Sequence, residues 1–347
     1  MSLFKLKGTL NSRAKIILTF LGFGILFFIW FGLTFGKNPI IAGAILPNPW
    51  AVLLSFGEMY RENQLMTNIT RSIGLNLAGY LEAVIIAIPF GFLIGLYPFF
   101  RGTFQRQVDA LRFVPLTAVT GLFIIWFGIN IGMKVHFLAF GIFIYLLPIV
   151  VQRIDEIDDV YYKTVYTLGA SNWQVIKSVY IPAVIARLSD DIRVLTAISW
   201  TYIIIAESLG NQGGIGALIW RAGLRQGRSD KVFALLIIII LIGFLQDKLF
   251  LYLDKEFFPH KYQQSMHGEK LKKQNTIGLL LNYFWNTLLW VMLGGYLVLF
   301  LNELIGFLDT RILSEAFGGT VWVIHSLVFI VIIYRLRKLI VKRKLAV

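Results

Sequence analysis

Long runs of apolar residues recur along almost the whole chain, and this feature restricts the possible folds more than any other. About 20 apolar residues in an α-helix cross the roughly 30 Å hydrocarbon core of a bilayer. Inside that core the backbone polar groups must be satisfied by the protein, and for runs of this length a helix does so. We count eight such segments: 15–36, 72–98, 108–128, 134–151, 191–209, 232–253, 277–304 and 319–334. The sequence therefore predicts an all-α integral membrane protein, a polytopic helical bundle.

The composition agrees with this class, because 57% of the residues are hydrophobic and only 15% are charged. The segment 108–128 is the weakest of the eight, since Arg112, Pro115 and Thr117 interrupt its start. The first segment follows a basic flank, as in a signal peptide, but it lacks a small-x-small cleavage site. We therefore expect the first segment to be retained as a membrane anchor.

The formal charge of +14 would suit a nucleic-acid-binding protein, but the distribution of the charges favours a membrane protein. With the N-terminus inside, most Lys and Arg residues fall on cytoplasmic segments, as the positive-inside rule expects. These segments are 5–15, 101–106, 153–187, 248–273 and 335–344. The pattern predicts that both termini are cytoplasmic, that the lipid bilayer surrounds the spans and that nucleic acid is not a partner.

The residue types that usually catalyse reactions or bind metals are scarce. The chain has no Cys, which excludes disulfides, thiol catalysis and Cys-ligated metals. His136, His260, His267 and His325 are dispersed, so we expect no dedicated metal site and no clustered groups of a membrane enzyme. These residues therefore disfavour a membrane enzyme, and we expect no enzymatic activity.

A hydrophilic island, residues 153–189, separates two long apolar segments. In it, Gly169 is followed after nine residues by Val179-Tyr-Ile-Pro182. Glycine permits a sharp turn between two short helices, and Pro182 either ends the second helix or opens the next one. Apolar positions at helical spacing would suit a groove in a partner protein, although an ordinary loop lying on lipid is the alternative. These positions are Tyr162, Val165 and Tyr166 in the first helix and Trp173, Ile176 and Val179 in the second.

The run from Leu168 to Ala183, LGASNWQVIKSVYIPA, resembles the coupling loop of ABC importer permeases. Motifs similar to those of that family occur in order on both sides of it. They are Leu46-Pro-Asn-Pro49, Arg112-Phe-Val-Pro115, Trp126-Phe-Gly128, Ala206-Glu-Ser-Leu-Gly210 and Gly213-Gly-Ile-Gly216. The series is similar to the nitrate/sulfonate/taurine branch of the family and covers residues 45–259.

The resemblance implies a six-span permease core that forms a homodimer around a translocation path in a bacterial inner membrane. It implies ATP-binding cassette ATPase subunits and an extracytoplasmic substrate-binding protein as partners, with ATP bound by the ATPase and no cofactor in this chain. The implied solute is a small organic or inorganic anion such as nitrate, a sulfonate or taurine. No GxxxxGK[ST] loop occurs here, which agrees with a separate ATPase. The residues implied for ATPase coupling are Lys163, Tyr166, Leu168, Gly169, Ala170, Trp173, Ile181 and Pro182.

Two features depart from the family pattern. Lys163 stands where the motif opens with an acidic residue, and Thr164 and Val165 stand where two alanines are usual. Two C-terminal spans also exceed the six that the resemblance implies. The expected domains are an N-terminal segment with its anchor at 1–44, the core at 45–259 with the coupling loop at 153–189, a cytoplasmic linker at 260–276, and two further spans with a basic tail at 277–347.

Glu207 is the carboxylate that most needs an explanation within the predicted spans. Unpaired in lipid it would cost about 2–4 kcal/mol, so it should face a partner or an aqueous cavity. It either shapes the translocation path or anchors the glycine-rich loop at 210–216. Trp126 and Trp200 are further candidates for the path, although such aromatic residues more often pack. Gly91 and Gly95 form a GxxxG pattern that would let two helices pack closely.

Arg221, Arg225 and Arg228 fall outside on this topology, and their i, i+4, i+7 spacing would align them on one face of a helix. They are candidates for contact with an anionic solute or with acidic residues of the delivery protein, with lipid headgroups as the ordinary alternative. Asp190 and Asp191 are expected to open the fifth span, because carboxylates suit a helix N-terminus.

A self-sufficient secondary transporter or channel is the alternative function. It would be expected to carry coupling carboxylates inside its spans or an inverted repeat. Only Glu82, Glu207 and Asp247 are candidates for such carboxylates, and no repeat is evident.

Overall fold

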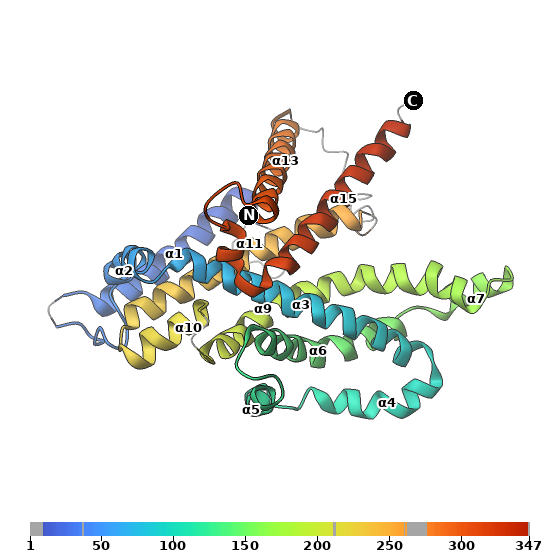
Figure 1. The fold of residues 1–347 in the computed structure, drawn as a ribbon, viewed down its shortest axis with the longest axis horizontal. Coiled ribbons are helices and arrows are strands. Elements are labelled where there is room, and N and C mark those ends of the chain that lie inside the picture. The colour runs from blue at the N-terminus through green and yellow to red at the C-terminus, as the bar shows by residue number, and fades with distance from the viewer. Residues whose placement is uncertain (1–9, 37, 211–212, 260, 262–275, 346–347) are drawn as a thin grey trace. The chain divides into compact units, whose positions relative to one another are not determined.

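The computed structural model describes residues 10–36, 38–210, 213–259, 261 and 276–345, and helices joined by short loops make up this part of the chain (Figure 1). No strand occurs among the described residues, and the predicted all-α class is confirmed. The chain divides into two compact units, one of residues 1–65 with 218–238 and the other of residues 66–217 with 239–347. Most of the predicted linker 260–276 lies outside the described residues, and the predicted domain boundaries stay predictions.

The first unit contains α1 (Ser12–Thr34), α2 (Pro49–Glu62) and the start of α11 (Ser229–Phe257). Pro49 opens α2, and the Asn48 side chain accepts a hydrogen bond from the N–H of Trp50, which satisfies a free backbone donor of the first turn. Glu58 of α2 forms ion pairs with Arg228 at 2.7 Å and Lys231 at 2.7 Å. These charged contacts hold α2 against the start of α11.

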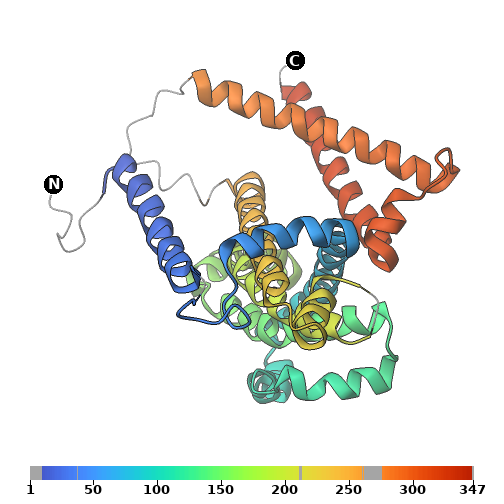
Figure 2. The ribbon, with the colours of Figure 1, turned by 90° about the vertical axis from the view of Figure 1, so that its left-hand side faces the viewer.

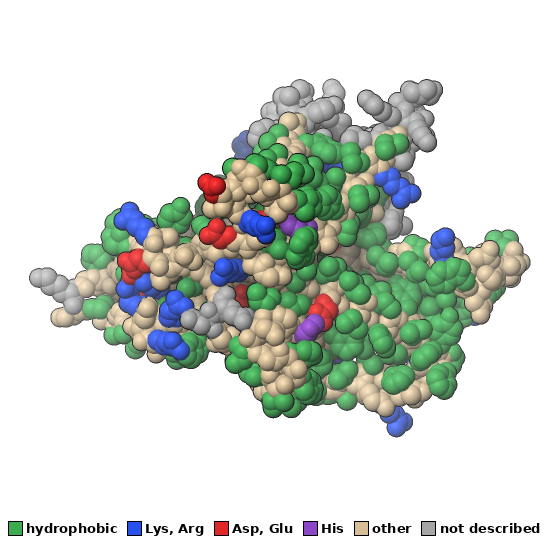
Figure 3. Space-filling model, in the orientation of Figure 1, with side chains coloured by type: hydrophobic (Ala, Val, Ile, Leu, Met, Phe, Trp, Pro, Cys, Tyr) green, Lys and Arg blue, Asp and Glu red, His purple; other side chains and the backbone are tan. Residues whose placement is uncertain are grey.

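The second unit is built around α6 (Ile131–Asp155) and α9 (Ile181–Ser208), which pack against each other along their lengths. Fully buried side chains of both helices form its centre, among them Phe137, Leu138, Leu188 and Ile203. Hydrophobic side chains dominate the face seen in Figure 3, as expected for a protein surrounded by lipid.

The other helices of the second unit are α3 (Leu65–Leu96), α4 (Pro98–Leu111), α5 (Leu116–Phe127), α7 (Asp159–Thr167), α8 (Asn172–Val175), α13 (Thr276–Ile305), α14 (Ile312–Phe317) and α15 (Val321–Leu345). The short helix α10 (Ile215–Trp220) and the π-helical turn η2 (Arg221–Arg225) precede α11.

The predicted count of eight spans is not confirmed. Six helices of the described chain are long and apolar enough to cross a membrane, or seven if α4 and α5 form one broken span. α9, which contains the predicted fifth span, is not among them. The predicted span 108–128 is not one straight helix, because α4 and α5 meet at 108° around Arg112–Pro115. Pro115 disfavours a helical conformation at the residue before it, which explains the break.

The GxxxG pattern brings α3 close to α6. A side-chain Cβ on Gly95 would lie 2.5 Å from Ile154 Cδ1, and one on Gly91 would overlap Val150. Only glycine therefore permits this helix–helix distance, as the pattern predicted.

The two C-terminal helices are joined through α14 and the 3₁₀ turn η4 (Gly318–Thr320), as Figures 1 and 2 show. Asn302 organises the connection, because it donates to Thr310 O at 2.9 Å and accepts from Leu308 N at 2.7 Å. This connection packs on α3: Thr70 donates to Ala316 O at 2.7 Å, and a Cβ on Gly74 would overlap Thr320.

Candidate functional site

The predicted turn in the hydrophilic island lies at Gly169, between α7 and α8. Asp158 caps α7 by accepting from Val160 N at 3.0 Å. Gly169 has φ +81° and donates to Tyr166 O at 2.9 Å, so glycine supplies the left-handed residue that ends α7. Ser171 and Gln174 then form a capping box that starts α8. Local sequence thus specifies both sides of the turn, and we call residues 156–182 the hairpin.

Pro182 does not end the second arm of the hairpin. The π-helical turn η1 (Ile176–Tyr180) follows α8, and the backbone stays right-handed helical at Ile176 and Ile181. Pro182 lies in the first turn of α9, where its missing N–H costs little. Of the two alternatives for Pro182, the structure shows the second, in which the proline opens the next helix. The second arm therefore continues directly into α9.

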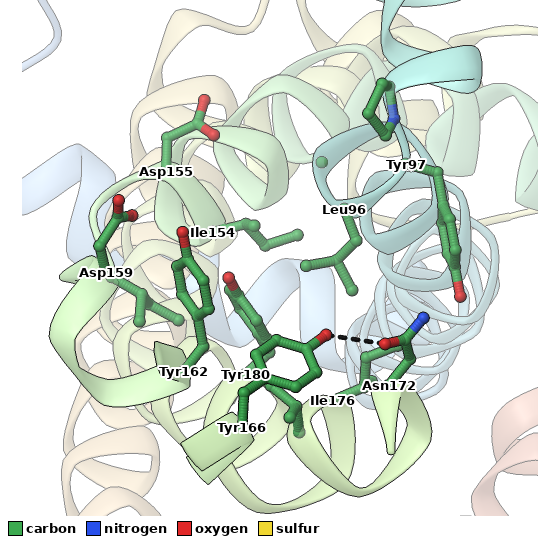
Figure 4. A pocket seen from close by; sticks show the side chains of 14 residues that line it. Leu96, Tyr97, Ile154, Asp155, Asp159, Tyr162, Tyr166, Asn172, Ile176 and Tyr180 are labelled. Atoms are coloured by element: carbon green, nitrogen blue, oxygen red, sulfur yellow. Dashed lines mark hydrogen bonds between the residues drawn. The ribbon is translucent and has the colours of Figure 1, made fainter. Parts of the chain in front are cut away.

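The hairpin encloses a cavity of about 490 Å³ against the joint of α3 and α4 (Figure 4). Tyr162 and Tyr180 stack with their ring centroids 6.2 Å apart. Tyr166 donates its hydroxyl hydrogen to Asn172 Oδ1 at 2.8 Å, which ties the two arms together. Tyr162, Tyr166 and Ile176 line this cavity, so these members of the predicted apolar faces pack within the chain, with Tyr166 still 43% exposed.

A different set of apolar side chains is exposed on the hairpin. Leu168 beside the turn is 82% exposed and Trp173 is 65% exposed. Val160 and Tyr161 are each 64% exposed, although helical spacing from Tyr162 did not single them out. Sequence reasoning missed these two because it took the apolar face at Tyr162 for the exposed one. Exposed apolar groups gathered on one short hairpin are typical of a protein-binding surface.

The remaining residues predicted for coupling lie around this surface. Lys163 is exposed and forms an ion pair with Asp159 at 2.9 Å, and this contact raises the pKa of Lys163. Ala170 follows the turn and is partly buried. Ile181 is partly buried and Pro182 exposed at the start of α9. The structure gathers the predicted set on one hairpin, and its role in coupling stays a prediction.

Arg153 fixes the base of the hairpin. Its guanidinium makes two parallel bonds to Asp191, both 2.7 Å, and contacts Glu156 at 2.7 Å. Arg187 of α9 also pairs with Glu156 at 3.2 Å. The hydrogen bond from Arg153 is the main reason that the pKa of Glu156 lies below its ordinary value. This network joins the end of α6 to α9 just below the hairpin.

The acidic residues Asp190 and Asp191 do not open a helix, because α9 begins about nine residues earlier, at Ile181. Asp190 pairs with Lys261 at 3.0 Å. Nearby, Arg193 Nε contacts Asp247 at 2.5 Å. The prediction that these carboxylates serve a helix N-terminus is therefore wrong, because both lie inside α9, where Asp191 binds Arg153 of α6 and Asp190 binds Lys261.

Glu207 ties the glycine-rich loop to α3. The carboxylate is 2% exposed, accepts from Ser72 Oγ at 2.7 Å, and accepts from Gly216 N at 2.8 Å. Ser72 Oγ in turn accepts from Ile215 N at 2.8 Å, and a Cβ on Gly214 would overlap the Glu207 carboxylate. Glu207 therefore lies where it can anchor the glycine-rich loop, which is one of the two predicted alternatives. Its role in shaping the translocation path stays a prediction.

The other two residues predicted for the path lie elsewhere. Trp200 is buried and donates its indole N–H to Gln246 Oε1 of α11 at 2.8 Å. Trp126 is 63% exposed and packs beside Phe123 on α5. Glu207 lines a cavity of about 340 Å³, whose lining does not include Trp126 or Trp200.

The three outside arginines are not aligned on one helix face. η2 ends at Arg225, and Gly227 takes φ +61° before Arg228. Arg225 lies over the Trp220 ring at 4.6 Å, whereas Arg228 pairs with Glu58 and with Asp230 at 2.8 Å. The hydrogen bond from Arg228 is the largest cause that lowers the pKa of Glu58. Arg228 therefore holds the first unit together and is not a free cation.

The chain matches a known family over its central part. A family model described as the binding-protein-dependent transport system inner membrane component matches residues 87–258, which include the hairpin and Glu207. The chain belongs to this family. The predicted family of importer permeases is thus confirmed, and the chain is a membrane subunit of the ABC importer type and not a catalytic enzyme.

Two relatives support the sulfonate/taurine branch. The aliphatic sulfonates transport permease protein SsuC of Bacillus subtilis is 28% identical over 67% of this chain and 83% of its own length. The taurine transport permease TauC of Escherichia coli is 26% identical over 64% of this chain and 81% of its own length. An inward-facing methionine ABC transporter structure shares the fold with a TM-score of 0.50 at 14% identity, covering 55% of this chain and 94% of that one.

Proposed function

We propose that the hairpin 156–182 is the surface on which a separate ATP-binding subunit drives this permease. The observation that carries the proposal is the exposed apolar pair Leu168 and Trp173 on a hairpin whose base is fixed by Arg153. Exposed apolar anchors of this kind release free energy when a groove of a partner protein covers them.

The continuity of the second arm with α9 gives a route for mechanical coupling. Because α8, η1 and α9 form one helical path, displacement of the tip moves a rod that ends at Glu207. At 1.5 Å per residue, α9 alone spans about 40 Å. Glu207 then transmits the movement to the glycine-rich loop and to α3 through Gly216 and Ser72.

The remaining parts of the proposal follow from the family. The permease forms a homodimer in a bacterial inner membrane with both termini in the cytoplasm, and a substrate-binding protein delivers the solute outside. The ATPase partner, not this chain, binds ATP. The solute is a small organic anion or zwitterion of the sulfonate or taurine type, a proposal supported by the two named relatives.

The test is co-purification of ATPase from native membranes in a mild detergent. Trp173→Glu should abolish recovery of the ATP-binding subunit, because a carboxylate cannot enter an apolar groove without a large desolvation penalty. Trp173→Phe is the matched control and should retain it. Equal recovery with both variants, from chains that are equally folded by circular dichroism, would refute the hairpin as the docking surface.

A further inference from the structure

The cavity beside Glu207 contains two cationic side chains that have no acceptor within the described chain. The cavity is about 340 Å³ and lies inside the second unit. Arg71 of α3 and Lys134 of α6 line it, together with Glu207 and the turn 317–320. A volume of this size is ample for a small polyatomic ion with some water.

Lys134 is the more deeply buried of the two cationic residues. The residue is 2% exposed, and within the described part of the chain its ammonium makes no hydrogen bond or ion pair. Arg71 Nε is likewise buried without an acceptor. Buried cations without partners are costly, so native proteins rarely retain them without a reason.

Glu207 does not satisfy these cations. One carboxylate oxygen accepts from Ser72, and the other accepts from Ser72 and Gly216, so the group is directed to the loop. Two cations and one carboxylate leave a formal charge of +1 in the cavity. Ile131, the first residue of α6, also lines it, so the positive end of a 25-residue helix lies nearby.

We propose that this cavity is a binding site for a small oxyanion group, of the sulfonate, sulfate or phosphate type, held between Arg71 and Lys134. A tetrahedral oxyanion presents several acceptors at once, which suits a guanidinium from α3 and an ammonium from α6 lining one cavity. The proposal goes beyond ATPase coupling, since binding to the isolated chain requires no ATPase.

The connection between the two C-terminal helices supplies one wall of the site. Phe317, Gly318 and Thr320 line the cavity, and all three lie beyond the family match that ends at residue 258. The bond from Thr70 to Ala316 holds this wall on α3. One function of the C-terminal pair is therefore to close the anion cavity.

The oxyanion has two possible sources, a free anion or the phosphate of a lipid headgroup. The full chain is reconstituted in nanodiscs of phosphatidylcholine alone, and its thermal unfolding is followed during titration with inorganic sulfate and with methanesulfonate. A parallel arm contains phosphatidylglycerol without added anion. Stabilisation by the soluble anions identifies a free-anion site, and stabilisation by phosphatidylglycerol alone identifies a headgroup site.

Lys134→Met tests the site without leaving a buried charge, so the variant is expected to fold. It should weaken the apparent affinity for the bound anion at least tenfold, as expected for loss of a hydrogen bond to a charged group. Lys134→Arg keeps the charge and should retain binding, and Arg106→Gln, an exposed cation outside the cavity, should change nothing. If wild type and Lys134→Met respond alike to sulfate, methanesulfonate and phosphatidylglycerol, the proposal is overturned.

Discussion

Arg153→Met tests whether the hairpin is held by its base or by its own turn. Methionine keeps the apolar stem of arginine but removes the guanidinium that bonds to Asp191 and Glu156. The variant leaves both carboxylates without their main partner, while the turn at Gly169 stays unchanged. The variant therefore removes the contacts at the base of the hairpin without changing the residues that form its turn.

The size of the effect follows from the burial of the pair. Exposed ion pairs contribute about 0–1 kcal/mol, whereas breaking a buried pair costs about 3–5 kcal/mol. The side chains of Arg153 and Asp191 are 27% and 15% exposed, between these limits, and the contact is bidentate. We expect the free energy of unfolding to fall by about 2 kcal/mol.

The assay is reversible unfolding in mixed micelles with increasing sodium dodecyl sulfate, followed by circular dichroism. Lys163→Met is the matched control, because its ion pair with Asp159 lies in the same hairpin but is 63% and 62% exposed. That control should leave the unfolding midpoint unchanged. The double variant Arg153→Met with Asp191→Leu should recover part of the loss, since it removes the unpaired carboxylate.

Equal effects of Arg153→Met and Lys163→Met would refute this reasoning, as would a double variant that is less stable than Arg153→Met alone. A pH series gives an independent check through Glu156, whose folded-state pKa lies below its ordinary value of 4.5. A lowered pKa contributes stability that is present above pH 4.5 and is lost as the pH falls through the folded-state value. The part of the Arg153→Met effect due to Glu156 should therefore shrink in acid.

Three further substitutions test other contacts. Gly95→Val should destabilise the chain by about 1–3 kcal/mol in the same unfolding assay, because its side chain overlaps Ile154, whereas Gly102→Val meets no neighbour and should not act by this route. Trp200→Phe should cost about 1 kcal/mol through loss of the bond to Gln246, and Gln246→Leu added to it should cost little more. Glu58→Gln should destabilise the start of α11, where Lys231 is buried, and this should appear as faster amide exchange at residues 229–235.

The features that could be predicted from the sequence are those encoded by neighbours along the chain. The turn at Gly169 requires a residue with positive φ, and the capping box of Ser171 and Gln174 lies within four residues. The close packing of α3 on α6 could likewise be predicted from the GxxxG pattern, because the absence of side chains at these positions permits it. The long apolar segments predicted the class in the same way, through a length that matches the bilayer.

The contacts that sequence reasoning missed join residues far apart in the chain. Asp191 looked like a helix-opening carboxylate because the preceding residues are polar, and nothing local indicates that Arg153, 38 positions earlier, binds it. Arg228 likewise matched a helical spacing with Arg221 and Arg225, but Glu58 bonds to it across 170 positions. In both cases a local pattern was taken to explain the charged residue, and the fold gave it a partner far away in the chain.

Unlike Asp191 and Arg228, Lys134 has no charged partner among the described residues. The new inference therefore starts from this residue. Sequence reasoning gave this residue no role, yet the fold buries it and gives its ammonium no acceptor among the described residues. Arg153 and Arg228 show that this chain satisfies its partly buried cations with bidentate carboxylates where geometry allows. A buried cation left without one, facing a cavity that also holds Arg71, is therefore better explained by a ligand than by imperfect packing.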